Sequence, residues 1–171
     1  MLRAGYQYVV QMDADFSHDP GRLPALREAL DQADVVLGSR DVAGGGVCHW
    51  PLRRRLLSWA GSSYAALVLG LPSHDMTSGF KGFNRRALEA LNLAKVRSTG
   101  YAFQIEVTYR CHRLGFHIAE LPIMFEDRRT GASKMSRLVV TEALLLVWRL
   151  RFEELRQRRR LRWSDLAGAV R

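Results

Sequence analysis

The sequence has 171 residues, of which 47% are apolar and 25% charged, so it predicts one folded domain with its own core and excludes a disordered polymer. Its 26 Lys and Arg outnumber 17 Asp and Glu, giving a net charge of +9, and all but three of these cations are Arg. The two cysteines, Cys48 and Cys111, lie far apart, which excludes a disulfide scaffold or a cysteine zinc site as the organising device.

The N-terminal residues have no apolar signal-peptide core, and no apolar run reaches the roughly 20 residues needed to cross a bilayer. We therefore expect a protein that is soluble or bound to a membrane surface.

The first third of the chain predicts a strand, a helix and a second strand. A buried strand is expected over 8–12, and a helix over 20–32 that Asp19 caps and Pro20 begins. A second strand follows over 34–39. This order predicts a parallel crossover unit, hence an α/β fold.

The rest of the chain continues the alternation of helices and strands. After a glycine-containing loop over 40–51, we expect elements in this order: a helix over 52–69, a polar turn over 72–79, a short strand over 80–83, helices over 85–91 and 103–114, a strand over 117–123, a charged loop over 126–136 and a long helix over 137–160. Pro122 should keep the last strand at an edge or an end. We divide the chain into an α/β part, 1–136, and a basic amphipathic helix and tail, 137–171.

Asp13 and Asp15 directly follow the first predicted strand. Two carboxylates at this spacing, at the carboxyl end of a buried strand, occupy the ligand-binding edge of an α/β sheet. They repel each other unless a cation or a proton lies between them, and hard oxygen ligands suit Mg²⁺ or Mn²⁺. Ser17 can complete such a site through its hydroxyl or a water. His18 is interpreted as a loop residue, because a hard-cation site has little use for imidazole.

Arg40 and Asp75 are further polar candidates. Arg40 ends the second strand at the same edge, where it would face the ligand of Asp13 and Asp15, or form a structural ion pair with Asp41 or Asp13. Asp75 begins a polar turn and can serve as a base, a charge partner or a cap.

Two later segments are strongly basic. The loop over 126–136 gathers cations around Gly131, which suits closure over a phosphate or an ordinary solvated loop. From Arg137 onward nine Arg face four acids, a net +5, along a helix that also carries an apolar face. Such a helix suits an anionic membrane surface, and equally docking on the protein's own sheet. No nucleic-acid-binding motif is present, so we expect no nucleic-acid partner, although the charge alone would accept one.

Together these segments resemble the polyprenol monophosphomannose synthases, also called dolichol-phosphate mannosyltransferases, which are inverting GT-A glycosyltransferases of family 2. The resemblance spans roughly 5–150 and rests on several motifs in the family's order: M-D-A-D-F-S-H-D-P at 12–20, G-S-R at 38–40, G-G-G-V at 44–47 with W-P at 50–51, D-M-T-S-G-F at 75–80, G-Y-A-F-Q-I-E at 100–106 and R-R-T-G-A-S-K-M at 128–135.

This resemblance implies metal-dependent transfer of mannose from GDP-mannose to a polyprenyl phosphate at the cytoplasmic face of a membrane. Asp13 and Asp15, with Ser17, would hold Mg²⁺ or Mn²⁺ against the donor diphosphate, and Asp15 would thereby be catalytic. Ala14 would contact the donor. The donor diphosphate or the acceptor phosphate would be contacted by Arg40, Arg128 and Lys134. Asp75 would be a catalytic or acceptor-side carboxylate.

The resemblance also implies a partial GT-A (Rossmann-like) mixed sheet flanked by helices, lacking the N-terminal nucleotide-binding strands that precede the metal strand in this family. We accordingly expect a truncated chain with one unpaired sheet edge, peripheral at the inner face of the membrane and attached there with or without a separate membrane-anchoring protein. The alternatives are a catalytically inactive fragment or membrane-surface protein derived from such an enzyme, and a related transferase that uses another sugar donor.

Overall fold

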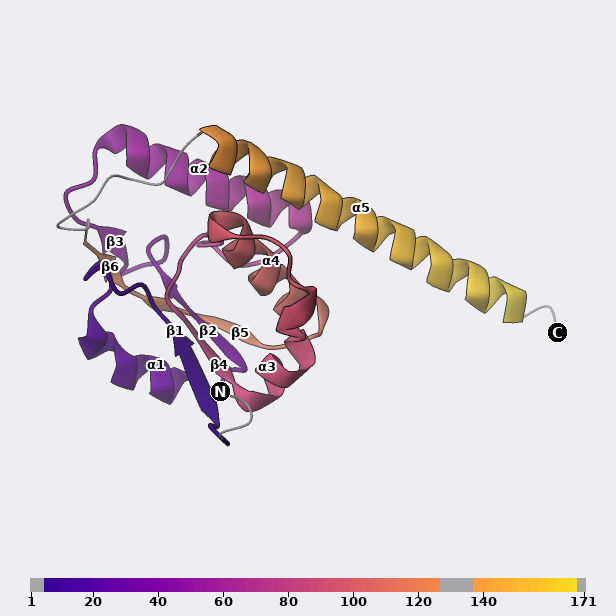
Figure 1. The fold of residues 1–171 in the computed structure, drawn as a ribbon, viewed down its shortest axis with the longest axis horizontal. Coiled ribbons are helices and arrows are strands. Elements are labelled where there is room, and N and C mark those ends of the chain that lie inside the picture. The colour runs from indigo at the N-terminus through magenta and orange to yellow at the C-terminus, as the bar shows by residue number, and fades with distance from the viewer. Residues whose placement is uncertain (1–4, 127–136, 169–171) are drawn as a thin grey trace.

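The fold is built on a four-stranded mixed sheet, seen in a computed structural model that describes residues 5–126 and 137–168. The strands lie in the order β1 (Tyr8–Gln11), β4 (Lys81–Asn84), β2 (Val35–Ser39) and β5 (Ile118–Pro122) (Figure 1). Strand β4 is antiparallel to both β1 and β2, whereas β2 and β5 are parallel. The expected parallel crossover is confirmed, because β1 and β2 run in the same direction; β4 lies between them.

The two outer strands of the sheet are β1 and β5. The position of β5 agrees with the expectation from Pro122, which pairs with Ser39 at the end of the ladder. Within the part of the chain that the structure describes, β1 pairs only with β4. The outer backbone groups of β1 therefore form an exposed edge.

Strand β2 is the centre of the core because each of its residues is buried. Alternation along the strand sends Val35 and Leu37 to one face of the sheet and Val36 to the other. The first face is covered by α3 (Arg85–Leu91) and α4 (Gly100–Arg113), and the second by α1 (Leu23–Ala29).

A glycine allows α1 to approach the sheet closely. A Cβ atom at Gly82 would lie 2.4 Å from Cδ2 of Leu26, a fully buried residue of α1. The predicted helix over 20–32 is divided in the structure into a 3₁₀ turn, η2 (Pro20–Arg22), and α1. Asp19 caps the turn as expected, since its carboxylate accepts a 2.8 Å hydrogen bond from the Gly21 amide.

Three short elements were not expected from the sequence. They are the 3₁₀ turn η3 (Leu93–Lys95) and two parallel strands, β3 (Gly46–Val47) and β6 (Met124–Phe125). Strands of two residues are too short to show a period-2 pattern, so only their tertiary pairing reveals them.

Helices α2 (Leu52–Leu69) and α5 (Arg137–Gly168) lie side by side and form an outer layer over α4 (Figure 1). Ala65 of α2, Ile105 of α4 and Val147 of α5 belong to one buried cluster. Helix α2 ends where predicted, at Gly70, whose φ of +67° suits a residue without Cβ. Helix α5 runs beyond the predicted 160, and its C-terminal half extends away from the rest of the fold (Figure 1). Among the described helices, none combines the length and apolarity that a bilayer crossing requires.

Candidate functional site

The loop after β1 carries the two predicted metal-binding carboxylates. Asp15 accepts hydrogen bonds from the Ser17 amide, at 3.1 Å, and from the Ser17 hydroxyl. Ser17 therefore lies beside Asp15, where its amide and hydroxyl both hold the loop; its role in a metal site stays a prediction. Phe16 between them has a φ of +63°, an unfavourable backbone conformation for a bulky residue.

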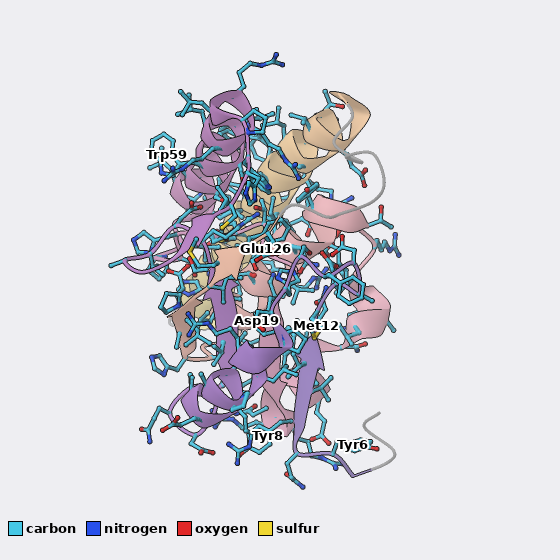
Figure 2. The ribbon with its side chains drawn as sticks, turned by 90° about the vertical axis from the view of Figure 1, so that its left-hand side faces the viewer. Tyr6, Tyr8, Met12, Asp19, Trp59 and Glu126 are labelled. Atoms are coloured by element: carbon cyan, nitrogen blue, oxygen red, sulfur yellow. The ribbon has the colours of Figure 1, made fainter. Side chains whose placement is uncertain are left out.

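The turn over 75–79 lies directly against this loop. A Cβ at Gly79 would come within 3.1 Å of Oδ2 of Asp13, so glycine is the residue that allows the Asp13 carboxylate to lie there. Two motifs more than 60 residues apart are thus brought together. Figure 2 labels Met12, which follows β1, together with Asp19 and Glu126 in this part of the molecule. The Glu126 amide donates to the Ser17 carbonyl at 3.2 Å.

Arg40 and Asp75 form a buried ion pair at the end of β2. Nε of Arg40 donates to Oδ2 of Asp75 and one terminal nitrogen donates to Oδ1, both at 2.7 Å. The Arg40 amide also donates to Asp75, at 3.1 Å, and the guanidinium reaches the Thr77 hydroxyl at 2.8 Å. The ion pair that the sequence left open therefore exists, but its partner is Asp75 rather than Asp41 or Asp13.

Burial and pairing have opposite effects on these two groups. Burial by itself would raise the pKa of Asp75, but hydrogen bonds and the charge of Arg40 outweigh it and hold the pKa below its usual value. Burial would likewise lower the pKa of Arg40, and Asp75 raises it above its usual value. The pair is therefore charged on both sides at neutral pH.

Other residues fix the turn and the guanidinium from outside. Glu120 of β5 accepts from the amides of His74 and Asp75, at about 3 Å each, and from the His74 ring. The rings of Trp50 and Phe125 lie 5.6 and 5.5 Å from the Arg40 guanidinium carbon. The sequence analysis missed these contacts, because isolated acidic and aromatic residues in loops and edge strands carry no spacing signal.

Neighbouring Asp41 behaves differently from Asp75. Burial, followed by the charge of Asp75, raises the pKa of Asp41 above its usual value. The charge of Asp41 also raises the pKa of Arg40, but by less than the hydrogen bond and charge of Asp75.

An apolar groove begins at the same turn. Its wall includes Thr77 of the turn, Tyr101 of α4, Gly61 of α2 and Leu144 of α5. Apart from Ser58, Thr77 and the tyrosine hydroxyls, the remaining lining side chains are hydrocarbon. The groove has a volume of about 90 Å³ and runs between α2, α4 and α5. A charged centre and an apolar channel thus share Thr77.

A second, more polar cleft of about 420 Å³ lies at the carboxylate loop itself. It is lined by residues 16–20 of the loop together with Arg22, Met124 and Glu126. One wall is His18, which lies in a loop as interpreted from the sequence but is buried, with 3% of the residue exposed. Neither ring nitrogen has a hydrogen-bond partner within the described ranges, an omission that costs about 1–3 kcal/mol for a buried polar group.

Two predicted phosphate-binding residues, Arg128 and Lys134, lie outside the described residues, as does most of their loop. Ala14 is described and is exposed beside the two carboxylates. Of the predicted site residues that the structure describes, it therefore brings together two groups: Asp15 with Ser17, and Arg40 with Asp75. Gly79 joins the second group to Asp13.

Comparison with known sequences identifies the class of protein. The profile of glycosyl transferase family 2 matches residues 1–91, more than half of the chain. The chain belongs to this glycosyltransferase family.

The most informative relatives are bacterial. The chain is 47% identical over 161 residues to the undecaprenyl-phosphate mannosyltransferase of Micrococcus luteus, which covers 92% of this chain and 66% of the relative. It is 44% identical over 153 residues to the polyprenol monophosphomannose synthase of Mycolicibacterium smegmatis, covering 88% of this chain and 58% of the relative. These relatives confirm the resemblance carried by the motifs, and the chain spans less than two thirds of their length.

A solved structure confirms the fold. The glucosyl-3-phosphoglycerate synthase of Mycobacterium tuberculosis, in complex with phosphoglyceric acid, superposes with a TM-score of 0.55 over 85% of this chain and 50% of its own, at 21% identity. Its complex with uridine diphosphate gives a TM-score of 0.53. The mixed α/β architecture is therefore of the GT-A type expected from the resemblance.

Proposed function

We propose that this chain takes part in the transfer of mannose from GDP-mannose to a polyprenyl phosphate, with inversion at the sugar. The observation that carries the proposal is the turn over 75–79, which touches Asp13 through Gly79 and lines the apolar groove through Thr77. A site with a polar end and an adjoining hydrocarbon channel suits an acceptor with a phosphate head and a long apolar tail. The names of the two bacterial relatives support the same reaction.

The donor set at the carboxylate loop fits Mg²⁺ or Mn²⁺. The Asp13 side chain is 55% exposed and Asp15 is partly exposed, so the carboxylate oxygens of both residues are accessible to a cation and its waters. Within the described residues no group of three His, Cys, Asp or Glu side chains is placed to hold a metal. Two carboxylates completed by water and substrate phosphate oxygens are, however, the usual way in which proteins bind Mg²⁺. A cation held there supplies positive charge for the departing diphosphate.

Arg40 and Asp75 have different proposed roles. Asp75 has both oxygens engaged by Arg40 and its own turn, so its contacts favour a role in positioning Arg40. Its predicted role as a catalytic carboxylate stays a prediction; the acceptor phosphate is already anionic and needs no strong base. Arg40 is proposed to place positive charge beside the phosphate groups, together with Arg128 and Lys134 of the following loop, which would close over the substrates.

The carboxylate role is tested by Asp15→Ala. The variant and the unaltered chain are compared for transfer of radiolabelled mannose from GDP-mannose to undecaprenyl phosphate with Mn²⁺, both alone and joined to the part of the M. luteus relative that this chain does not cover. Loss of transfer only in Asp15→Ala is expected, whereas Asp31→Ala, an exposed carboxylate of the first helical region, is the matched control. Undiminished transfer by Asp15→Ala would refute the metal role. Transfer of glucose from UDP-glucose, with none of mannose from GDP-mannose, would show that the proposed donor is wrong.

The groove is tested at Gly61, where an added Cβ meets no atom within 4 Å. Gly61→Phe fills the groove, and Gly61→Ala is the matched control because it leaves the groove open while favouring the helix. We expect the KM for undecaprenyl phosphate to rise at least about tenfold in Gly61→Phe, as the loss of some 1.4 kcal/mol of binding requires. Equal KM values in both variants would remove the groove from acceptor binding.

We also propose that the protein lies on the cytoplasmic face of a membrane, with or without a separate anchoring protein. Exposed apolar side chains follow one stripe of α5, at Leu145, Trp148, Phe152 and Leu155, and Arg149, Arg151 and Arg156 lie among them. Helix α2 adds exposed Trp59, which points outward in Figure 2. An apolar stripe flanked by cations supports binding to anionic lipid.

This placement is tested with vesicles of phosphatidylcholine with and without phosphatidylglycerol. Binding should need the anionic lipid and weaken with salt, and Trp148→Ser should weaken it at every salt concentration. Vesicle binding without metal-dependent nucleotide binding would favour the second candidate function, a non-catalytic membrane-surface protein derived from this family. Equal binding to DNA would show a merely basic surface.

A further inference from the structure

His18 is a buried polar side chain that nothing in the described fold satisfies. Its side chain is 1% exposed, yet Nδ1 and Nε2 both lack a hydrogen-bond partner. A buried imidazole with two unpaired nitrogens packs less favourably than a hydrocarbon of the same size. The ring can therefore accept a hydrogen-bond partner that comes within reach of either nitrogen.

Two aromatic rings fix the orientation of this imidazole. Phe80 stacks on it with centroids 5.3 Å apart and an interplanar angle of 21°, and Phe125 meets it edge-on at 5.2 Å and 82°. Phe80 follows the turn that carries Gly79, and Phe125 belongs to β6. Since both rings confine the imidazole plane, its nitrogens point in set directions.

One of those directions leads to Asp13. Nε2 lies 3.7 Å from Oδ2 of Asp13, which is just too long for a hydrogen bond. An approach of about half an ångström or more would bring the two atoms to ordinary hydrogen-bond length. The same oxygen lies against Gly79, where a Cβ would come within 3.1 Å of it, while more than half of the Asp13 side chain stays exposed to a cation.

We propose that His18 is a positioning residue for Asp13. The Nε2–H group donates to Oδ2 of Asp13 when that carboxylate is drawn into a divalent-cation site with Asp15, and this bond holds the other carboxylate oxygen toward the cation. Outer partners that orient a ligating carboxylate commonly contribute 10- to 100-fold in metal affinity. The inference rests on the proposed metal role of Asp13 and Asp15, and goes beyond it by assigning a residue that binds neither metal nor substrate.

Three substitutions separate hydrogen bonding from packing. His18→Phe keeps a flat ring between Phe80 and Phe125 but carries no donor. His18→Gln places an N–H group at about the same distance along the side chain as Nε2 of histidine, whereas the shorter His18→Asn places it at the distance of Nδ1. The affinity of each purified chain for Mn²⁺ is measured from the electron paramagnetic resonance signal of free Mn²⁺, with no substrate present, and the thermal unfolding midpoint is measured with and without Mn²⁺.

We expect the Kd for Mn²⁺ to rise about 10- to 100-fold in His18→Phe and His18→Asn and by no more than about threefold in His18→Gln. The midpoint without metal should be unchanged or higher in His18→Phe, because the unpaired nitrogens are gone. Equal Mn²⁺ affinity in the unaltered chain and His18→Phe would overturn the positioning role while leaving the metal site in place. Absence of Mn²⁺ binding by the unaltered chain would overturn both this inference and the metal role.

Discussion

Replacing Lys81 with methionine perturbs a charge in the middle of the sheet. Lys81 lies on β4 with its side chain completely buried, and Nζ donates to the Gln104 carbonyl at 2.7 Å and to the Thr108 hydroxyl at 2.8 Å. Burial lowers the pKa of Lys81 from 10.5 to about 7, although the charge of Asp75 acts in the opposite direction. Two acceptors can be satisfied by a neutral amine, which still has two N–H groups.

The pKa of Lys81 sets the size and sign of the effect. Between about pH 7 and 10.5 the folded chain loses this proton while the unfolded chain keeps it, so stability rises as pH rises through this window. Each unit of pKa difference corresponds to about 1.4 kcal/mol, and the full difference to about 5 kcal/mol. Because Lys81 in the folded chain is still half protonated at about pH 7, the free energy of unfolding rises by about 2 kcal/mol between about pH 7 and pH 9.

The measurement is urea unfolding of the unaltered chain and Lys81→Met at both pH values. We expect the free energy of unfolding of the unaltered chain to gain about 2 kcal/mol relative to Lys81→Met over this range. Burial also raises the pKa of Cys111 to about 11 and that of Tyr109 to about 12. Loss of the Lys81 charge raises the pKa of Cys111 further, so both groups stay protonated in both folded proteins up to pH 9 and their contributions nearly cancel. Unfolding free energies that change in parallel would refute the reasoning.

Three other substitutions test the surrounding structure. Asp75→Asn leaves the Arg40 charge buried without its partner and should cost about 3–5 kcal/mol in urea unfolding; a loss below about 1 kcal/mol would contradict a buried ion pair. Gly82→Ala forces a Cβ against Leu26 and should lower the free energy of unfolding by about 1–3 kcal/mol. The same substitution should cost less when it is made in a Leu26→Ala chain, where the side chain that the Cβ meets is gone; an equal cost in both chains would contradict the clash. Glu154→Gln removes the carboxylate charge that accepts hydrogen bonds from two arginines and a tyrosine at the junction of α4 and α5. Amide hydrogen exchange in α5 should become faster, whereas unchanged exchange would show that apolar packing alone holds the helix.

Local sequence pattern determined much of the architecture. The apolar run at Val35–Leu37 identified the central strand, and the helical spacing up to Gly70 gave α2 its observed bounds. The cap at Asp19 and the edge position of β5 also followed from single residues whose backbone chemistry is restrictive. The Asp13 and Asp15 pair was found in the same way, since its position after a strand is a local feature.

Other features were decided by the tertiary structure alone, because they join residues that are distant in the sequence. Three features each join segments tens of residues apart: the insertion of β4 between β1 and β2, the choice of Asp75 as the partner of Arg40, and the position of Asp13 against Gly79. Local periodicity carries no signal for such pairings, because they are set by how the helices cover the sheet. For the same reason His18 could be seen as part of the site only once Phe80 and Phe125 had closed around its ring and turned a polar loop residue into a buried one.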